Sequence, residues 1–256
     1  MATVHEILDF LFSLAPEAGK EPWDHVGLMV GDRSRPVETV LVALDPFYPV
    51  CQEAAARGAQ LLVTHHPLFF GGTHAVTDET EDGRSAMLLL ERGMAHIAMH
   101  TNLDAARGGV NDCLAARLGL REVTGLLGEL PCLGRVGVID TCSLPDFLAA
   151  VKEKLGCPGL RYCDGGRPVR RVAVGGGACG EFFRQAAAAG CDTFLTGDVK
   201  YNQFRDAQYL GLNLIDAGHF WTENPVCDAL AAQLRRAFPA LRVMQSETHT
   251  DVTKFA

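Results

Sequence analysis

Two adjacent histidines, His65 and His66, end an apolar run in the stretch VTHHPLFF (63–70). Adjacent side chains of a regular strand point to opposite faces, so both imidazoles can serve one site only where the strand has opened into a loop. Pro67 favours that opening, because proline ends strand pairing and biases the preceding residue toward an extended conformation. Neutral imidazoles bind divalent transition metals. The stretch therefore predicts a metal site at the end of a strand.

Two more histidines are each followed by an acid four positions later. The pairs are His100 with Asp104 and His219 with Glu223, and each pair follows a strand-like run. The adjacent histidines, His219 and the two acids exceed what one tetrahedral ion needs. Five ligands with a bridging carboxylate suit two ions of zinc, manganese or iron, as in two-metal hydrolases. The alternative is that these are ordinary hydrogen-bonding histidines, the usual role of a single histidine at a strand end.

Three further features have candidate roles in catalysis or ligand binding. Asp198 ends a strand of its own, where it can act as a base or orient water. His100 can orient Asp104 or carry a proton. The turn GGGACG (175–180) fits G-x-G-x-x-G, so its amides can meet a phosphate. A tight turn with close packing of a helix on a sheet is the commoner reason for such a glycine run.

The elements that must position these residues occur twice in the chain. Residues 40–66 and 171–198 each give an aliphatic strand, a turn, an Ala-rich helix ended by glycine, and a second aliphatic strand. This βαβ unit, seen twice, predicts an α/β fold of two related lobes with largely parallel sheets. Ligands of such sheets bind at the carboxyl ends of the strands, where the candidate residues fall.

The lobes are expected to cover 1–125 plus 226–256 for the first and 126–225 for the second, with no inserted extra domain. The first lobe should begin with an amphipathic helix, since Val4, Ile7, Leu8 and Leu11 share one helical face. A helix is expected to start near Ser143, another over 225–238, and a final strand over 241–246.

Composition narrows the class of protein. The chain has 256 residues and a net charge of −8, which argues against a nucleic-acid-binding surface. Its apolar runs are too short for a membrane helix, and its start is too acidic for a secretory signal. The nine cysteines are scattered without a C-x-x-C. This pattern favours a cytoplasmic protein over a disulfide-bonded secreted one.

Several stretches together resemble the NIF-three-like proteins, also known as GTP cyclohydrolase 1 type 2 homologues. The similarity rests on five motifs in this order: WDHVGLMVGD (23–32), VTHHPLFF (63–70), HTNLD (100–104), TGDVKYNQ (196–203) and GHFWTE (218–223). The resemblance implies a homohexameric ring whose subunits each hold two divalent ions. Carried over position by position, it makes His65, His66, Asp104, His219 and Glu223 the metal ligands.

The resemblance has two departures and leaves two functions open. His25 stands where the family usually has Asn, and Asn202 where it often has His. The first function is a dinuclear-metal-dependent hydrolase acting on a small phosphorylated or nucleotide-like compound, with His100 and Asp198 as catalytic candidates. The second is a non-catalytic metal-binding ring with a structural, storage or regulatory role.

Overall fold

The computed structural model describes residues 1–255, which form two compact units. Unit 1 contains residues 1–106 and 226–250, and unit 2 contains residues 107–225 and the tail that begins at Asp251. The predicted α/β class is confirmed. The first boundary lies before the predicted one at 125, because a helix and a strand within 107–125 pack against strands of unit 2.

Unit 1 is built on a sheet of five strands with the order β13-β4-β5-β6-β2. All neighbouring pairs are parallel except β2 with β6. Its strands are β1 (Ala2–Thr3), β2 (Gly27–Val30), β3 (Pro36–Val37), β4 (Thr39–Ala43), β5 (Leu61–Thr64), β6 (Ala95–Ala98) and β13 (Arg242–Gln245). Its helices are α1 (Val4–Leu14), η1 (Glu17–Gly19), α2 (Tyr48–Ala56), α3 (Glu81–Glu91), α4 (Thr101–Ala105) and α10 (Pro225–Ala237).

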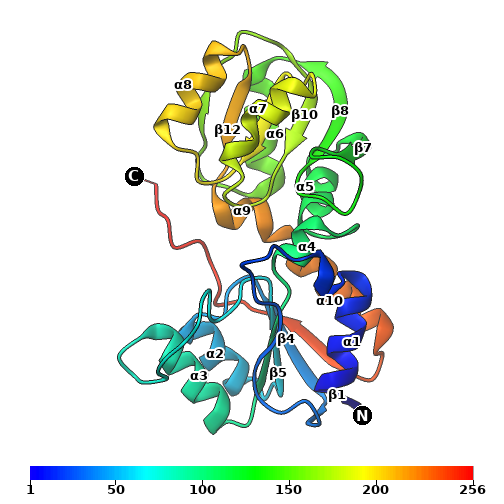
Figure 1. Ribbon diagram of the computed structural model, residues 1–256, viewed down its shortest axis with the longest axis vertical. Coiled ribbons are helices and arrows are strands. Elements are labelled where there is room, and N and C mark those ends of the chain that lie inside the picture. Colours follow the sequence, from blue (N-terminus) through cyan, green and yellow to red (C-terminus); the bar gives the residue numbers. More distant parts are fainter. Residues whose placement is uncertain (256) are drawn as a thin grey trace. The chain divides into compact units, whose positions relative to one another are not determined.

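Helices cover both faces of this sheet. α2 and α3 share a buried cluster with the strands on one face, and α1 and α10 lie against the other (Figure 1). The predicted apolar face of α1 is confirmed, since Val4, Ile7, Leu8 and Leu11 are all buried. Thr3 caps the helix by accepting from the Glu6 amide, so the helix starts where its apolar pattern starts.

Unit 2 has a sheet of six strands with the order β7-β8-β10-β11-β12-β9. The strands are β7 (Arg121–Gly125), β8 (Arg135–Cys142), β9 (Arg161–Cys163), β10 (Val169–Val174), β11 (Thr193–Thr196) and β12 (Asn213–Asp216). The helices are α5 (Val110–Leu118), α6 (Leu144–Leu155), η2 (Gly180–Phe182), α7 (Phe183–Ala188), α8 (Tyr201–Tyr209) and α9 (His219–Glu223). α5 and α6 pack on one face and α7 and α8 on the other (Figure 1).

The sheet of unit 2 is more mixed than predicted. The predicted parallel core is present as β10-β11-β12, but β7, β8 and β9 run antiparallel to their neighbours. These three strands lie outside the repeated βαβ stretch, which is why the repeat did not predict their direction. The helix predicted near Ser143 is α6, which Ser143 caps, and the predicted final strand is β13.

The polar candidates of each unit lie along one edge of its sheet. In unit 1, His65 and His66 directly follow β5, and His100 follows β6. Asp24 precedes β2, which is antiparallel to β6, so it reaches the same edge. In unit 2, the glycine-rich turn follows β10, Asp198 follows β11 and His219 follows β12. Both rows lie at carboxyl ends of parallel strands, where ligands of such sheets bind.

Among residues 1–255, no helix combines the length and the apolar character that a crossing of the bilayer requires.

Glu53 of α2 anchors the segment after β13 and gives a prediction for stability. Burial alone would raise its pKa, but donors from Glu247, Ser246 and Arg57 lower the pKa from 4.5 to about 2. A lowered carboxyl pKa stabilises the folded state above about pH 4.5, and this stabilisation is lost as the pH falls toward 2. Glu53→Gln should therefore reduce the free energy of unfolding by about 2 kcal/mol at pH 7.

Urea unfolding at pH 7 and at pH 2.5 checks this, with Glu91→Gln, an exposed residue at the end of α3, as the control. The difference between the wild type and Glu53→Gln should be clearly smaller at pH 2.5 than at pH 7, because the stabilisation is largely lost as the pH approaches the folded-state pKa of about 2. An equal difference at both pH values would show that the Glu53 carboxylate does not hold the segment.

Candidate metal centre

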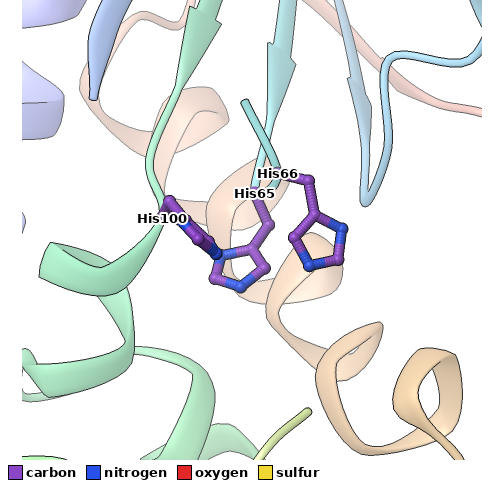
Figure 2. A group of neighbouring side chains, drawn as sticks. All are labelled: His65, His66 and His100. Carbon is purple, nitrogen blue, oxygen red and sulfur yellow. The ribbon is translucent and has the colours of Figure 1, made fainter. Parts of the chain in front are cut away.

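Three imidazoles of unit 1 converge at the carboxyl edge of its sheet (Figure 2). The ring centroids of His65 and His66 are 4.8 Å apart, and that of His100 lies 5.2 Å from the first and 5.5 Å from the second. The three side chains each offer a nitrogen within 4.8 Å of the others, a spacing that can hold a metal ion. The strand has opened after Thr64, as the sequence predicted, so the two adjacent rings reach one place.

Each of these rings has its Nδ1 atom fixed by an acceptor. His65 Nδ1 lies 2.8 Å from the Met99 carbonyl, His66 Nδ1 2.6 Å from Asp45 Oδ1, and His100 Nδ1 2.9 Å from Asp24 Oδ1. A carbonyl or an ionised carboxylate can only accept, so Nδ1 carries the proton and the neutral ring presents its lone pair at Nε2. This is the orientation that metal-binding histidines take from their outer partners.

The two carboxylates that hold these rings are strongly ionised. Burial alone would raise the pKa of Asp24, but hydrogen bonds from His100 and Thr101 lower it to about 2. Burial opposes ionisation of Asp45 too, and donors from His249 and His66 hold its pKa well below the usual range. Both residues are therefore acceptors at neutral pH.

Asp104 belongs to the same cluster. It lies on the short helix α4, with Oδ1 3.6 Å from His65 Nε2. His100 Nδ1 is bonded to Asp24, so an orientation of Asp104 by His100 would have to come from its Nε2 and stays a prediction. Asp24 also accepts from the Thr101 hydroxyl at 2.5 Å, which fixes the start of α4. The cluster thus combines oriented imidazoles with a carboxylate on one short helix.

Unit 2 carries a second donor set. His219 and Glu223 are four residues apart on α9, which places them on one face of the helix. His219 Nδ1 lies 2.7 Å from Asp198 Oδ2, and its Nε2 lies 3.0 Å from Glu223 Oε2. Burial alone would lower the pKa of His219, but these two carboxylates raise it to about 11. The set therefore attracts a cation, and a divalent ion would compete with the Nε2 proton.

Asp198 is placed to orient His219. Its backbone has a φ of +53°, a left-handed conformation that a residue other than glycine adopts at a cost. The hydrogen bond from His219 Nδ1 lowers the pKa of the Asp198 carboxyl and keeps it an acceptor. Asp198 thus has the same relation to His219 that Asp45 has to His66.

The glycine-rich turn packs closely against Glu223 and His219. Gly177 has a φ of +66°, and a Cβ atom added there would lie 2.0 Å from Glu223 Oε1. The amides of Gly175, Gly176 and Gly177 donate to the Leu195 carbonyl, the Asn111 side chain and the Thr222 hydroxyl. Amides used in this way do not form a phosphate cradle, so the tight-turn interpretation is the correct one.

Sequence reasoning missed the residues that orient the histidines. Asp24 lies in the stretch WDHVGLMVGD, which resembles a motif of the family, but the motif alone assigns no role to this carboxylate. Asp45 follows β4 at the same edge as His66, a position that the strand pattern alone could have suggested. His249, which no sequence motif singles out, lies in the segment after β13, and its Nε2 is 2.9 Å from Asp45 Oδ2. His25 and Asn202, the two departures from the family pattern, are both exposed.

Known proteins share both the sequence and the fold of this chain. The family model described as Duf34/NIF3 (NGG1p interacting factor 3) matches residues 2–252. A GTP cyclohydrolase 1 type 2 homolog of Streptomyces coelicolor is 38% identical over 98% of this chain and 93% of its own length. One of Clostridium perfringens is 34% identical over 87% of each chain. The crystal structure of a Bacillus cereus protein related to NIF3 superposes with a TM-score of 0.93 at 25% identity, over 100% of this chain and 99% of the other. The chain belongs to the Duf34/NIF3 family.

Proposed function

We propose that this protein is a hydrolase dependent on two divalent metal ions. Its ligands would be His65, His66 and Asp104 from unit 1 with His219 and Glu223 from unit 2. The proposal rests on the hydrogen bonds of His65, His66 and His219. In each ring Nδ1 lies next to an acceptor oxygen, at 2.8, 2.6 and 2.7 Å respectively. Such support is characteristic of metal-binding histidines.

The donor set also suits the ions by its chemistry. Imidazole and carboxylate ligands fit zinc, manganese and iron. A carboxylate has two oxygens and can span two ions, so Glu223 is the best candidate for a bridge. When bound, paired ions lower the pKa of water and stabilise charge on the attacking and leaving oxygens.

The remaining side chains have supporting tasks. Asp45 and Asp198 fix the rings of His66 and His219. Asp24 fixes His100, whose Nε2 can then accept or give up a proton beside the ligands. A small phosphorylated or nucleotide-like compound is the proposed substrate. The chain has a net charge of −8, so the metal ions must supply the positive charge that attracts such an anion.

A turnover screen tests this function. Metal-loaded protein is assayed against nucleotides, phosphoesters and pterin precursors, with and without chelator. The proposal expects hydrolysis that chelator abolishes and added manganese or zinc restores. If no compound is turned over while a protein partner binds tightly, the non-catalytic metal-binding ring is the better account.

His100→Ala separates a proton carrier from a ligand. We expect the variant to keep both ions and to lose about 100-fold or more in turnover, the usual contribution of a positioned acid or base. Elemental analysis and the turnover assay measure the two effects, with His5→Ala, an exposed histidine of α1, as the control. Loss of one equivalent of metal would instead make His100 a ligand, which its distance from the other two rings permits.

Two further properties complete the proposal. We place the protein in the cytoplasm, since its nine cysteines are all free thiols. The family resemblance also leads us to expect a homohexamer. Sedimentation velocity at low micromolar concentration should show a single species of six chains, and a monomer would contradict the proposed assembly.

A further inference from the structure

Three neighbouring strands of unit 1 end in polar residues that contact one another. β13, β4 and β5 are adjacent and parallel, so their carboxyl ends meet at one edge. His249 follows β13, Asp45 follows β4 and His66 follows β5. His249, Asp45 and His66 thus link the C-terminal segment of unit 1 to the proposed metal ligand His66. His249 is not itself among the proposed ligands.

The carboxylate of Asp45 joins the two histidines. Its Oδ1 lies 2.6 Å from His66 Nδ1, and its Oδ2 lies 2.9 Å from His249 Nε2. One oxygen is hydrogen-bonded to His66 and the other lies within ion-pair distance of His249, so the carboxylate is confined between the two rings. Its position in turn fixes the ring of His66. The His249 side chain is 4% exposed, and its ring packs against Phe47 with the centroids 5.7 Å apart.

Independent contacts hold the segment 246–250 in place. The Glu53 carboxylate accepts from the Ser246 hydroxyl at 2.5 Å, the Glu247 amide at 2.9 Å and the Thr248 amide at 3.2 Å. The Ser246 hydroxyl in turn accepts from the His249 amide at 3.1 Å. These bonds fix the backbone of the segment, and they therefore also hold the His249 ring next to Asp45.

We infer that the segment 246–250 is a positioning strap for His66. In this arrangement His249 holds Asp45, and Asp45 holds His66 in the tautomer that carries its proton on Nδ1 and presents Nε2 to a ligand. His249 and Glu53 are positioning residues that touch neither substrate nor metal. The consequence for metal affinity rests on the proposed function, whereas the consequence for the tautomer of His66 does not.

A purely structural role makes a different prediction. If the strap only closes the edge of the sheet, loss of the His249 ring lowers the free energy of unfolding and leaves the tautomer of His66 unchanged. If it positions His66, the tautomer and the binding of one ion change as well. A glutamine at 249 distinguishes the two, because its side-chain nitrogen lies as many bonds from Cβ as His Nε2 and can donate to the same oxygen.

The test compares His249→Ala and His249→Gln in the full chain, with His74→Ala as the matched control in an exposed loop. Long-range ¹H–¹⁵N spectra after chelator treatment report the tautomer of His66, and zinc titration reports the affinity of each ion. We expect His249→Ala to mix the tautomers and weaken one ion by about 10-fold, within the range seen for outer partners of metal ligands. His249→Gln should restore both.

A wild-type tautomer spectrum in His249→Ala would overturn the inference, whatever the metal content. If the wild type binds no ion while the tautomer still depends on His249, the proposed function fails and the strap stands. Should His249→Ala not fold, Glu53→Gln provides the same readouts by releasing the strap away from the histidines. Unchanged tautomer and unchanged affinity in that variant would equally overturn the inference.

Discussion

Gly177→Ala is expected to remove at least one equivalent of bound metal and to lower turnover about 100-fold. The added methyl group would lie 2.0 Å from Glu223 Oε1 and 3.1 Å from His219 Nε2, so both side chains must move. Displaced ligands lose affinity by amounts of this order. The forced repacking should also reduce the free energy of unfolding by about 1–3 kcal/mol.

Gly190→Ala provides a matched control for this variant. Gly190 has a similar left-handed backbone, with a φ of +75°, but an added Cβ would meet no atom within 4 Å. This control should show only the backbone strain, about 1 kcal/mol, and retain its metal. Equal metal content in the two variants, measured by elemental analysis, would show that Gly177 is not needed for the space around Glu223.

Glu223→Gln is expected to reduce the metal content from two ions to one and to abolish most of the turnover. The substitution keeps the shape of the side chain but removes the charge that would lie between two cations. The pKa of its neighbour His219 should also fall, although Asp198 still supports it, because the Glu223 carboxylate is one of the two groups that raise it.

Glu181→Gln is the control for this charge change, since Glu181 is exposed on η2 of the same unit. Zinc titration and the turnover assay should leave it indistinguishable from the wild type. Two ions bound with wild-type affinity in Glu223→Gln would exclude Glu223 as the bridge and would make a carboxylate elsewhere responsible.

The sequence predicted the parts of the fold that repeat. The βαβ pattern gave β4-α2-β5 and β10-α7-β11, and it placed the histidines at the carboxyl ends of strands. It did not predict the antiparallel pairing of β7, β8 and β9, which depends on long-range contacts outside the repeat. Direction of pairing is set by which neighbour a strand meets in the folded sheet, and periodicity within one strand carries no such information.

The candidate metal ligands were predicted from their residue types, but the residues that orient the histidines were not. His65 and His66 are visible in the sequence because two imidazoles before a proline are unusual. Asp24 and Asp45 are single acids that belong to no metal-binding sequence pattern. Only the strand order brings Asp24 to His100 Nδ1 and Asp45 to His66 Nδ1. His249 reaches its place because β13 returns to the edge of the first sheet from the far end of the chain.

The most direct test of the account is an anomalous difference map from crystals of metal-loaded protein, collected at the absorption edge of the bound metal. The account predicts two peaks per chain, each about 2.0–2.3 Å from nitrogen or oxygen atoms of His65, His66, Asp104, His219 and Glu223. It also predicts that each imidazole meets its peak through Nε2. A map without peaks at these side chains after metal loading, or with one peak on His65, His66 and His100 alone, would contradict it.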